Sequence, residues 1–285
     1  MRVLVTGGRG QLGSELAAAF RAGDEVLATG RAELDVTDRG SVWRVCAEYK
    51  PDVVIHAAAY TNVDGCELDA DRAYRENALG TQNVALACQR IGAAMTYVST
   101  DFVFDGTKTS PYLEFDDPHP ISVYGRSKMA GERYVQSLLD RHFVVRTSWL
   151  YGHGSRNFVK TILTLAEQRS EIPAVVDEVG SPTYARDLAE ALVRLIQEPV
   201  YGVYHLSNEG SCSRYEYVKA ILEMAGKGTR VYPVSSAEFQ ERFPLPAKRP
   251  AYSVLGNFCA KNALGVHLRP WQEALEDFLR SLEYR

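Results

Sequence analysis

Three glycines directly behind the first apolar segment constrain the fold more than any other feature of the chain. Residues 2–6 are typical of a short buried strand, and Gly7, Gly10 and Gly13 follow it at the start of an amphipathic stretch over Leu12–Phe20. Such glycines let the backbone approach a pyrophosphate, to which the next helix offers free N–H groups. The position of the triplet between strand and helix favours a dinucleotide-binding turn over an ordinary tight turn.

The rest of the first half alternates between short apolar segments and segments with helical spacing. Strands are predicted at Glu25–Thr29, Val53–Ala59, Met95–Ser99 and Phe143–Thr147, and helices at Ser41–Tyr49, Asp71–Ile91 and Tyr124–Leu139. The continuous apolar run at 53–59 is typical of a parallel strand that is buried on both faces. This alternation predicts an α/β fold, a Rossmann-type doubly wound parallel sheet with right-handed crossovers.

The second half of the chain is less regular. Helices are predicted over 157–168 and 184–197, after a capping box formed by Ser213 and Glu216, and after Pro270, with loops between Phe243 and Gly265. No clean linker separates the halves. We therefore predict an NAD(P)-binding domain over residues 1–150 and a smaller, mainly substrate-binding domain over 151–285, with some later segments returning to the main sheet.

Composition excludes several classes of protein. Of 285 residues, 32 are Lys or Arg and 36 are Asp or Glu, so the net charge is 32 − 36 = −4, and no basic stripe indicates nucleic-acid binding. No apolar run approaches the roughly 18 residues that span a membrane, and the N-terminus lacks the apolar segment of a signal peptide. These features predict a cytoplasmic protein without a membrane or nucleic-acid partner.

Cysteine and histidine spacing argues against a metal centre. The five cysteines include no C-x-x-C pair, and the six histidines are scattered without metal-ligand spacing. We expect the cysteines to be small, mostly buried residues in a reducing compartment. No catalytic metal is predicted.

The end of the second predicted strand bears on the choice of cofactor. An NAD site usually has Asp or Glu there, whereas this chain has Ala28-Thr29-Gly30-Arg31. Arg31 could pair with a 2′-phosphate, which favours NADPH with NADH as an alternative, or it could be an ordinary surface charge. Asp35 and Val36 follow and could hold the adenine edge. The small residues of 57–61 leave room for a flat cofactor.

A Tyr-Lys pair supplies the candidate chemistry. Tyr124 and Lys128 lie four residues apart on a predicted helix and therefore on one face of it. A ketone that accepts a hydride needs a proton donor, and a nearby ammonium lowers the pKa of a phenol toward the working range. Lys128 can also bind the nicotinamide ribose. The alternative, a surface helix pair, is less consistent with the glycine turn upstream.

Other candidate site residues carry weaker signals. Ser99 and Thr100 end a buried strand, and either hydroxyl could hold the carbonyl, since spacing alone does not choose between them. Trp149 follows another strand at the edge where ligands bind, but a core tryptophan fits equally well. Arg249 could pair with a phosphate or be a solvated loop charge.

A series of motifs resembles the extended short-chain dehydrogenase/reductase superfamily and, within it, the dTDP-4-dehydrorhamnose reductase family. The motifs are VTGGRGQLGSEL, LDVTD, HAAAYTNVDGCE, RENALGTQNVA, VSTDFVFDG, YGRSKMAGE, RTSWLYG, GSPTYARDLA and RPAYSVL, and they cover nearly the whole chain in this order. The resemblance implies reduction of the 4-keto group of dTDP-4-dehydro-L-rhamnose by NADPH to dTDP-L-rhamnose. Reduction or epimerisation of another nucleotide sugar is an alternative, as is a regulatory subunit related to that of methionine adenosyltransferase.

The resemblance also implies roles for individual residues. Thr100 becomes the catalytic hydroxyl, Tyr124 the proton donor and Lys128 its partner. The sugar nucleotide would contact Thr100, Asp101, Tyr124 and Trp149, and the cofactor would contact Gly10, Gln11, Leu12, Asp35, Val36, Ala59, Tyr60 and Thr61.

Two features bear on how far the resemblance extends. Phe102 stands where family members often have Tyr, so one hydroxyl near the sugar is missing. Some members form homodimers around Mg²⁺ held by glutamates, and Glu15 matches one such position. A homodimer and Mg²⁺ at its interface are therefore alternatives for this chain.

Overall fold

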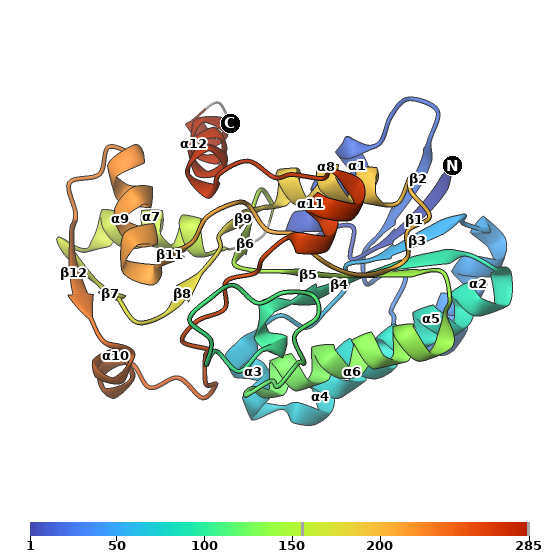
Figure 1. Cartoon of the computed structure of the whole chain (residues 1–285), viewed down its shortest axis with the longest axis horizontal. Coiled ribbons are helices and arrows are strands. Elements are labelled where there is room, and N and C mark those ends of the chain that lie inside the picture. Colours follow the sequence, from blue (N-terminus) through green and yellow to red (C-terminus); the bar gives the residue numbers. More distant parts are fainter. Residues whose placement is uncertain (155–156, 284–285) are drawn as a thin grey trace.

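Six parallel strands form the central sheet of the computed structural model, which describes residues 1–154 and 157–283. Their order is β10-β5-β4-β3-β1-β2 (Figure 1), which confirms the predicted doubly wound parallel sheet. Because β2 and β3 lie on opposite sides of β1, the strand order reverses beside β1, where such sheets bind ligands at the carboxyl edge. The strands are β1 Arg2–Thr6, β2 Glu25–Thr29, β3 Val53–His56, β4 Ala94–Thr100, β5 His142–Thr147 and β10 Gly202–His205.

Helices cover both faces of the sheet, and each face has its own apolar core. Helices α1 (Gln11–Ala19), α8 (Ala185–Leu195) and α11 (Phe258–Leu264) cover one face, where Leu16 and Leu188 are fully buried. Helices α2 (Arg39–Tyr49), α5 (Gly80–Ile91) and α6 (Val123–Leu138) cover the other, where Val135 and Cys88 are fully buried. The two layers lie on opposite sides of the strands in Figure 1. Cys46, Cys66, Cys88 and Cys212 are buried and free, as expected, whereas Cys259 is partly exposed.

The predicted helix over 71–91 consists of three pieces. It comprises α4 (Ala70–Tyr74), a π-helical turn η1 (Arg75–Leu79) and α5, and the short helix α3 (Val63–Leu68) precedes it. Asn62 caps α3 by accepting from Gly65 N, and Asp69 caps α4 by accepting from Arg72 N. Asn and Asp are favoured at such positions and mark a helix start in the sequence.

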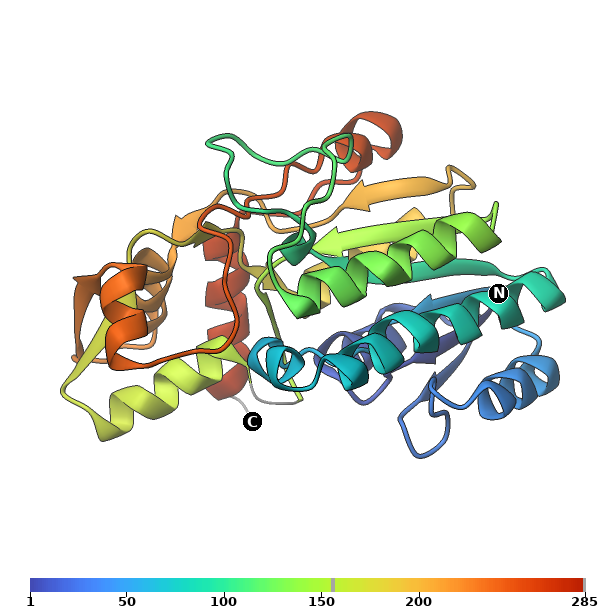
Figure 2. The same ribbon diagram turned by 90° about the horizontal axis from the view of Figure 1, so that it is seen from below.

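The smaller part of the molecule lies beyond the carboxyl edge of the sheet (Figure 2). Its core is aromatic, with Tyr151, Tyr217 and Phe278 fully buried among its helices. The predicted capping box of Ser213 and Glu216 is confirmed at the start of α9. Its elements are β6 Leu150–Tyr151, α7 Phe158–Gln168, β7 Glu171–Val175, β8 Val179–Gly180, β9 Thr183–Tyr184, β11 Cys212–Ser213, α9 Arg214–Met224, β12 Arg230–Val234, α10 Ser236–Arg242 and α12 Trp271–Glu283.

Segments from the second half return to the central sheet. Strand β10 pairs with β5 at the edge of the sheet, and α8 packs against α1. Residues 155–156 and 284–285 of the predicted second domain lie outside the described residues. The smaller part is therefore built from segments that leave the main sheet and come back to it.

Two local predictions were wrong. The strand predicted over 53–59 ends at His56, because residues 57–59 leave the sheet to cross the glycine turn. The loops predicted over 243–265 contain α11, which ends where Gly265 adopts φ +59° and its N–H donates to Lys261 O. A glycine at this position is a common helix-ending signal, and it could have revealed α11.

Candidate active site

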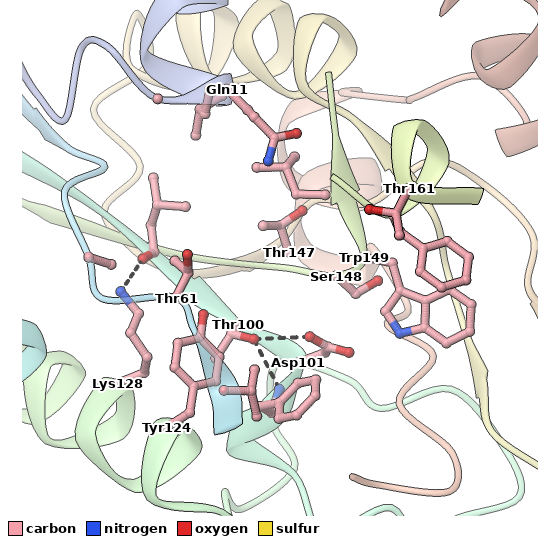
Figure 3. A pocket seen from close by; sticks show the side chains of 18 of the residues that line it. Gln11, Thr61, Thr100, Asp101, Tyr124, Lys128, Thr147, Ser148, Trp149 and Thr161 are labelled. Carbon is pink, nitrogen blue, oxygen red and sulfur yellow. Dashed lines mark hydrogen bonds between the residues drawn. The ribbon is translucent and has the colours of Figure 1, made fainter. Parts of the chain in front are cut away.

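One cavity of about 1210 Å³ lies between the carboxyl edge of the sheet and the smaller part of the molecule. Figure 3 shows Thr100, Tyr124 and Lys128 together on one side of it, with Gln11 and Trp149 on others. Because sequence-distant segments contribute to its wall, the fold brings nearly all predicted site residues together. These are Gly7, Gly10, Gln11, Leu12, Gly13, Arg31, Asp35, Val36, Ala59, Thr61, Thr100, Asp101, Tyr124, Lys128, Trp149 and Arg249.

Tyr60 is the predicted site residue that does not line the cavity. Its ring lies under the guanidinium of Arg72, whose Cζ is 4.1 Å from the ring centroid. Its backbone N–H donates to Asn77 Oδ1 over 2.8 Å, and its carbonyl accepts from Asn77 Nδ2 over 3.1 Å. Tyr60 therefore fixes the loop between β3 and α3 without presenting its side chain to the cavity.

The glycine turn leaves room for a pyrophosphate. Gly7 has φ +71°, and a Cβ there would lie 2.7 Å from Ala58 N, so the loops after β1 and β3 touch. A Cβ on Gly13 would lie 2.3 Å from Gly7 O. Gly10 caps α1 without a side chain, and the first residues of that helix line the cavity. This arrangement fits a dinucleotide phosphate at a helix N-terminus.

Two buried polar atoms near the turn also fit a ligand. Gln11 Oε1 and Thr147 Oγ1 are buried and have no hydrogen-bond partner within the described part of the chain, and both residues line the cavity. Buried polar groups are normally paired, so each is a candidate to bind a ligand. Thr147 was missed by the sequence analysis, although it is the register partner of Thr100 on the neighbouring strand.

The Tyr-Lys pair lies on the cavity side of α6. Ser122 caps this helix by accepting from Gly125 N, and Tyr124 lies in its first turn, 9% exposed. Lys128 Nζ donates to Val98 O over 2.7 Å and lies 4.1 Å from the centroid of the Tyr97 ring. This hydrogen bond and ring contact hold the ammonium between α6 and the sheet.

Burial changes the acidity of both groups. It lowers the pKa of the Lys128 ammonium to about 7, against the opposing charge of Glu132. It raises the pKa of the Tyr124 phenol well above its ordinary value, against the effect of a hydrogen bond with Thr100. The predicted lowering of this pKa by the Lys128 ammonium was therefore wrong, because burial of the phenol dominates. Tyr124 therefore stays protonated near neutral pH, as a proton donor must, while Lys128 titrates in that range.

The geometry distinguishes the two candidate hydroxyls. Ser99 Oγ donates to Glu132 Oε1 over 2.5 Å, in a buried group in which Glu132 also pairs with Arg146 over 2.8 Å. Thr100 Oγ1 instead donates to Asp101 Oδ1 over 3.0 Å and accepts from Phe102 N. Ser99 is thus engaged by Glu132, whereas Thr100 lies beside Tyr124 and affects the pKa of its phenol, which favours Thr100 as the hydroxyl of the site.

Asp101 is a buried carboxyl beside these groups. It is 2% exposed, and burial raises its pKa to about 6, against hydrogen bonds with Ser253 and Thr100. It opens the 3-10 turn η2 (Asp101–Val103), in which Phe102 packs edge-on against Tyr124 with ring centroids 5.6 Å apart. A buried carboxyl at a cavity wall is suited to accept a hydrogen bond from a sugar hydroxyl.

Trp149 is held in place by residues that the sequence analysis missed. Its backbone has φ +44°, and its ring lies so close to Gly180 that a Cβ there would be 2.4 Å away. The Arg214 guanidinium lies 3.4 Å from the Trp149 ring centroid and pairs with Glu178 over 3.7 Å. Arg249, also at this wall, pairs with Asp64 over 2.7 Å.

Asn77 joins the cofactor side of the site to the catalytic helix. Besides its two hydrogen bonds with the Tyr60 backbone, its Nδ2 donates to Ser127 Oγ over 3.0 Å. Ser127 Oγ in turn donates to Tyr124 O. Asn77 lies in the π-helical turn, a geometry that frequently occurs at functional sites.

Comparison with known proteins identifies the family. The family model for the RmlD substrate binding domain matches residues 1–284. The spore coat polysaccharide biosynthesis protein SpsK of Bacillus subtilis is 44% identical over 280 residues, 98% of this chain and 97% of that protein. The dTDP-4-dehydrorhamnose reductase of Aggregatibacter actinomycetemcomitans is 40% identical over 286 residues, 97% of each protein. This chain belongs to the dTDP-4-dehydrorhamnose reductase family.

A solved member of the dTDP-4-dehydrorhamnose reductase family supports the same assignment. The crystal structure of the Bacillus anthracis enzyme in complex with NADP superposes with a TM-score of 0.93 at 43% identity, and covers 98% of this chain and 99% of that one. The predicted resemblance is confirmed over nearly the full chain.

The glutamate that resembles a metal ligand of some family members already has partners here. Glu15 Oε1 lies 2.7 Å from His153 Nδ1, and its Oε2 lies 3.6 Å from Arg186. Within residues 1–154 and 157–283, no group of three or more His, Cys, Asp or Glu residues is arranged to hold a metal ion. None of the helices in these ranges is both long and apolar enough to cross a membrane.

Proposed function

We propose that this protein reduces the 4-keto group of dTDP-4-dehydro-L-rhamnose with NADPH and releases dTDP-L-rhamnose, a nucleotide sugar for cell-surface polysaccharides. The observation that carries the proposal is the meeting of Thr100, Tyr124 and Lys128 with the glycine turn in a single cavity. Relatives named dTDP-4-dehydrorhamnose reductase, one of them with bound NADP, support the substrate and the cofactor.

Three residues of this chain have separate roles in the reduction of the ketone. When bound, the reduced nicotinamide supplies a hydride to C4 of the sugar. Tyr124 donates its phenolic proton to the ketone oxygen, and the Lys128 ammonium stabilises the phenolate that forms. Thr100 would hold the same oxygen once its hydroxyl, which donates to Asp101 in the structure, turns to donate to the ketone. Positioning of both reactants in one cavity contributes much of the rate.

Other residues at the cavity would bind and orient the reactants. Gly7, Gly10 and Gly13 leave space for the cofactor pyrophosphate, and the first turn of α1 offers it N–H groups. Asp101 would accept from a sugar hydroxyl, and the Trp149 ring would cover the sugar or the base. Arg249 is suited to the diphosphate, since a guanidinium pairs well with phosphate oxygens.

The remaining expectations stay predictions. These are the cytoplasmic location, the homodimer, Mg²⁺ at its interface and the division of the chain near residue 150.

The alternative of a nucleotide-sugar epimerase requires a cofactor that stays bound through purification, whereas a reductase exchanges it at each turnover. Incubation with NADPH and dTDP-4-dehydro-L-rhamnose, followed by identification of the product by NMR, distinguishes these functions. Recovery of unreduced substrate from folded protein contradicts the proposal.

The proposed mechanism predicts that kcat/KM for ketone reduction depends on pH. Lys128 must be protonated to stabilise the phenolate, and its pKa is about 7. We therefore expect kcat/KM to be highest below that value and to fall as the pH rises through it, since Tyr124 remains protonated over the same range. Steady-state kinetics over a pH series, with circular dichroism to verify folding, measures this. A profile that is flat from about pH 6 to about pH 9 contradicts the role of Lys128.

A further inference from the structure

Arg9, rather than Arg31 alone, lies over the end of β2. The Arg9 side chain crosses Gly30 so closely that a Cβ on that glycine would lie 2.7 Å from both Cδ and Nε of Arg9. Arg9 is 76% exposed and lines the rim of the cavity beside Arg31. In Rossmann-type sites the end of the second strand meets the adenosine ribose, so Arg9 lies where a 2′-phosphate would be bound.

The side chain of Glu33 also contacts the end of β2, beside Arg9. The turn after β2 brings Glu33 N to donate to Gly30 O, and the carboxylate of Glu33 accepts from Gly30 N over 2.9 Å. The other carboxylate oxygen accepts from Arg9 Nη2. The residues at 28–31 include no carboxylate, but the fold supplies one from two positions further along the chain. The Glu33 carboxylate thus occupies the Arg9 guanidinium and the Gly30 N–H, two donors of the kind that bind a phosphate.

Arg31 is more firmly engaged than Arg9. Its guanidinium pairs with Asp35 over 3.3 Å and with Glu76 over 3.2 Å. Glu76 is only 12% exposed and is also paired with Arg72 over 2.9 Å. Moving Arg31 toward a phosphate would therefore loosen two ion pairs, whereas moving Arg9 loosens a single exposed one, and exposed ion pairs are weak.

We propose that Arg9 binds the 2′-phosphate of NADP(H) and that Glu33 sets the selectivity as an internal competitor for Arg9. This inference rests on the proposed use of a nicotinamide cofactor. When NADPH binds, its 2′-phosphate displaces the Glu33 carboxylate from Arg9. When NADH binds, the same carboxylate accepts from the free 2′-hydroxyl, as an acidic residue does in NAD sites. Glu33 thus weakens the preference for NADPH and allows the use of NADH.

Binding of two small probes tests the inference without any sugar substrate. The probes are 2′,5′-ADP and 5′-AMP, which differ only in the 2′-phosphate, and their affinities for the full chain are measured by isothermal titration calorimetry. We expect Arg9→Gln to weaken binding of 2′,5′-ADP about tenfold while 5′-AMP changes less than about twofold. Glu33→Gln should tighten binding of 2′,5′-ADP by about threefold to tenfold, because it removes a like charge beside the phosphate.

Two further variants serve as controls. Arg31→Gln should weaken 2′,5′-ADP less than Arg9→Gln does, and Arg21→Gln, at an exposed position in the loop before β2, should change neither affinity. Equal losses for both probes in Arg9→Gln, no gain in Glu33→Gln, or a larger loss in Arg31→Gln would each overturn the inference. Since the probes need no ketone, the expected affinities without sugar reduction would support the inference while contradicting the proposed reaction.

Discussion

Replacing Tyr124 with phenylalanine lowers the turnover of the sugar ketone by about 10²-fold or more, the scale expected for loss of a positioned acid. The variant keeps the ring that packs against Phe102 and loses only the hydroxyl that reaches Thr100. We therefore expect the loss to appear in kcat, with the dissociation constant for NADPH little changed. Steady-state kinetics and fluorescence titration of NADPH measure these two quantities.

Tyr74→Phe is the matched control for this experiment. Tyr74 is 38% exposed on α4 and does not line the cavity, so its loss should leave kcat unchanged. A near-normal kcat in Tyr124→Phe would contradict the proton-donor role. A large loss in Tyr74→Phe would instead attribute the effect to general sensitivity of the fold.

Replacing Arg146 with methionine should lower the free energy of unfolding by about 3–5 kcal/mol, because it leaves the buried Glu132 carboxylate without its counter-charge. The side chains of this pair are 4% and 3% exposed, and Arg146 Nε also donates to Glu132 Oε1 over 3.0 Å. The same carboxylate accepts from Ser99 on the strand that carries Thr100. Urea denaturation followed by fluorescence measures the loss.

A double variant separates the ion pair from the packing around it. In Glu132→Met with Arg146→Met neither member of this ion pair is left without its partner, so the combined loss should be smaller than the sum of the two single losses. Arg194→Met, at an exposed position on α8, should change stability little. Strictly additive losses, or an unfolding midpoint of Arg146→Met equal to that of the unsubstituted protein, would contradict this explanation.

The parts of the fold that could be predicted are those in which local pattern and chemistry agree. The glycine turn at 7–13 and the Tyr124–Lys128 spacing each depend on a few neighbouring residues, and parallel strands buried on both faces form continuous apolar runs. The alternation of side chains along a strand could also have separated Ser99 from Thr100, since consecutive residues point to opposite faces.

The rest of the site depends on contacts between distant segments. Arg214 contacts Trp149 from the start of α9, and Gly180 leaves room for that ring. Neither contact can be predicted from the sequence around the residues that make it. Glu33 is close to β2 in sequence, but its return to Gly30 depends on a turn that leaves no clear signal. The smaller part also has strands of two residues, such as β6 and β8, which are too short for periodicity to reveal.

The most direct measurement is the oxidation of NADPH in the presence of dTDP-4-dehydro-L-rhamnose, followed by the loss of its near-ultraviolet absorbance. The substrate is made in the same vessel by the enzymes that precede this step. We expect steady oxidation that depends on the sugar nucleotide and nearly disappears in Tyr124→Phe. No oxidation by folded protein, or equal rates with and without the sugar nucleotide, would contradict the proposed reaction.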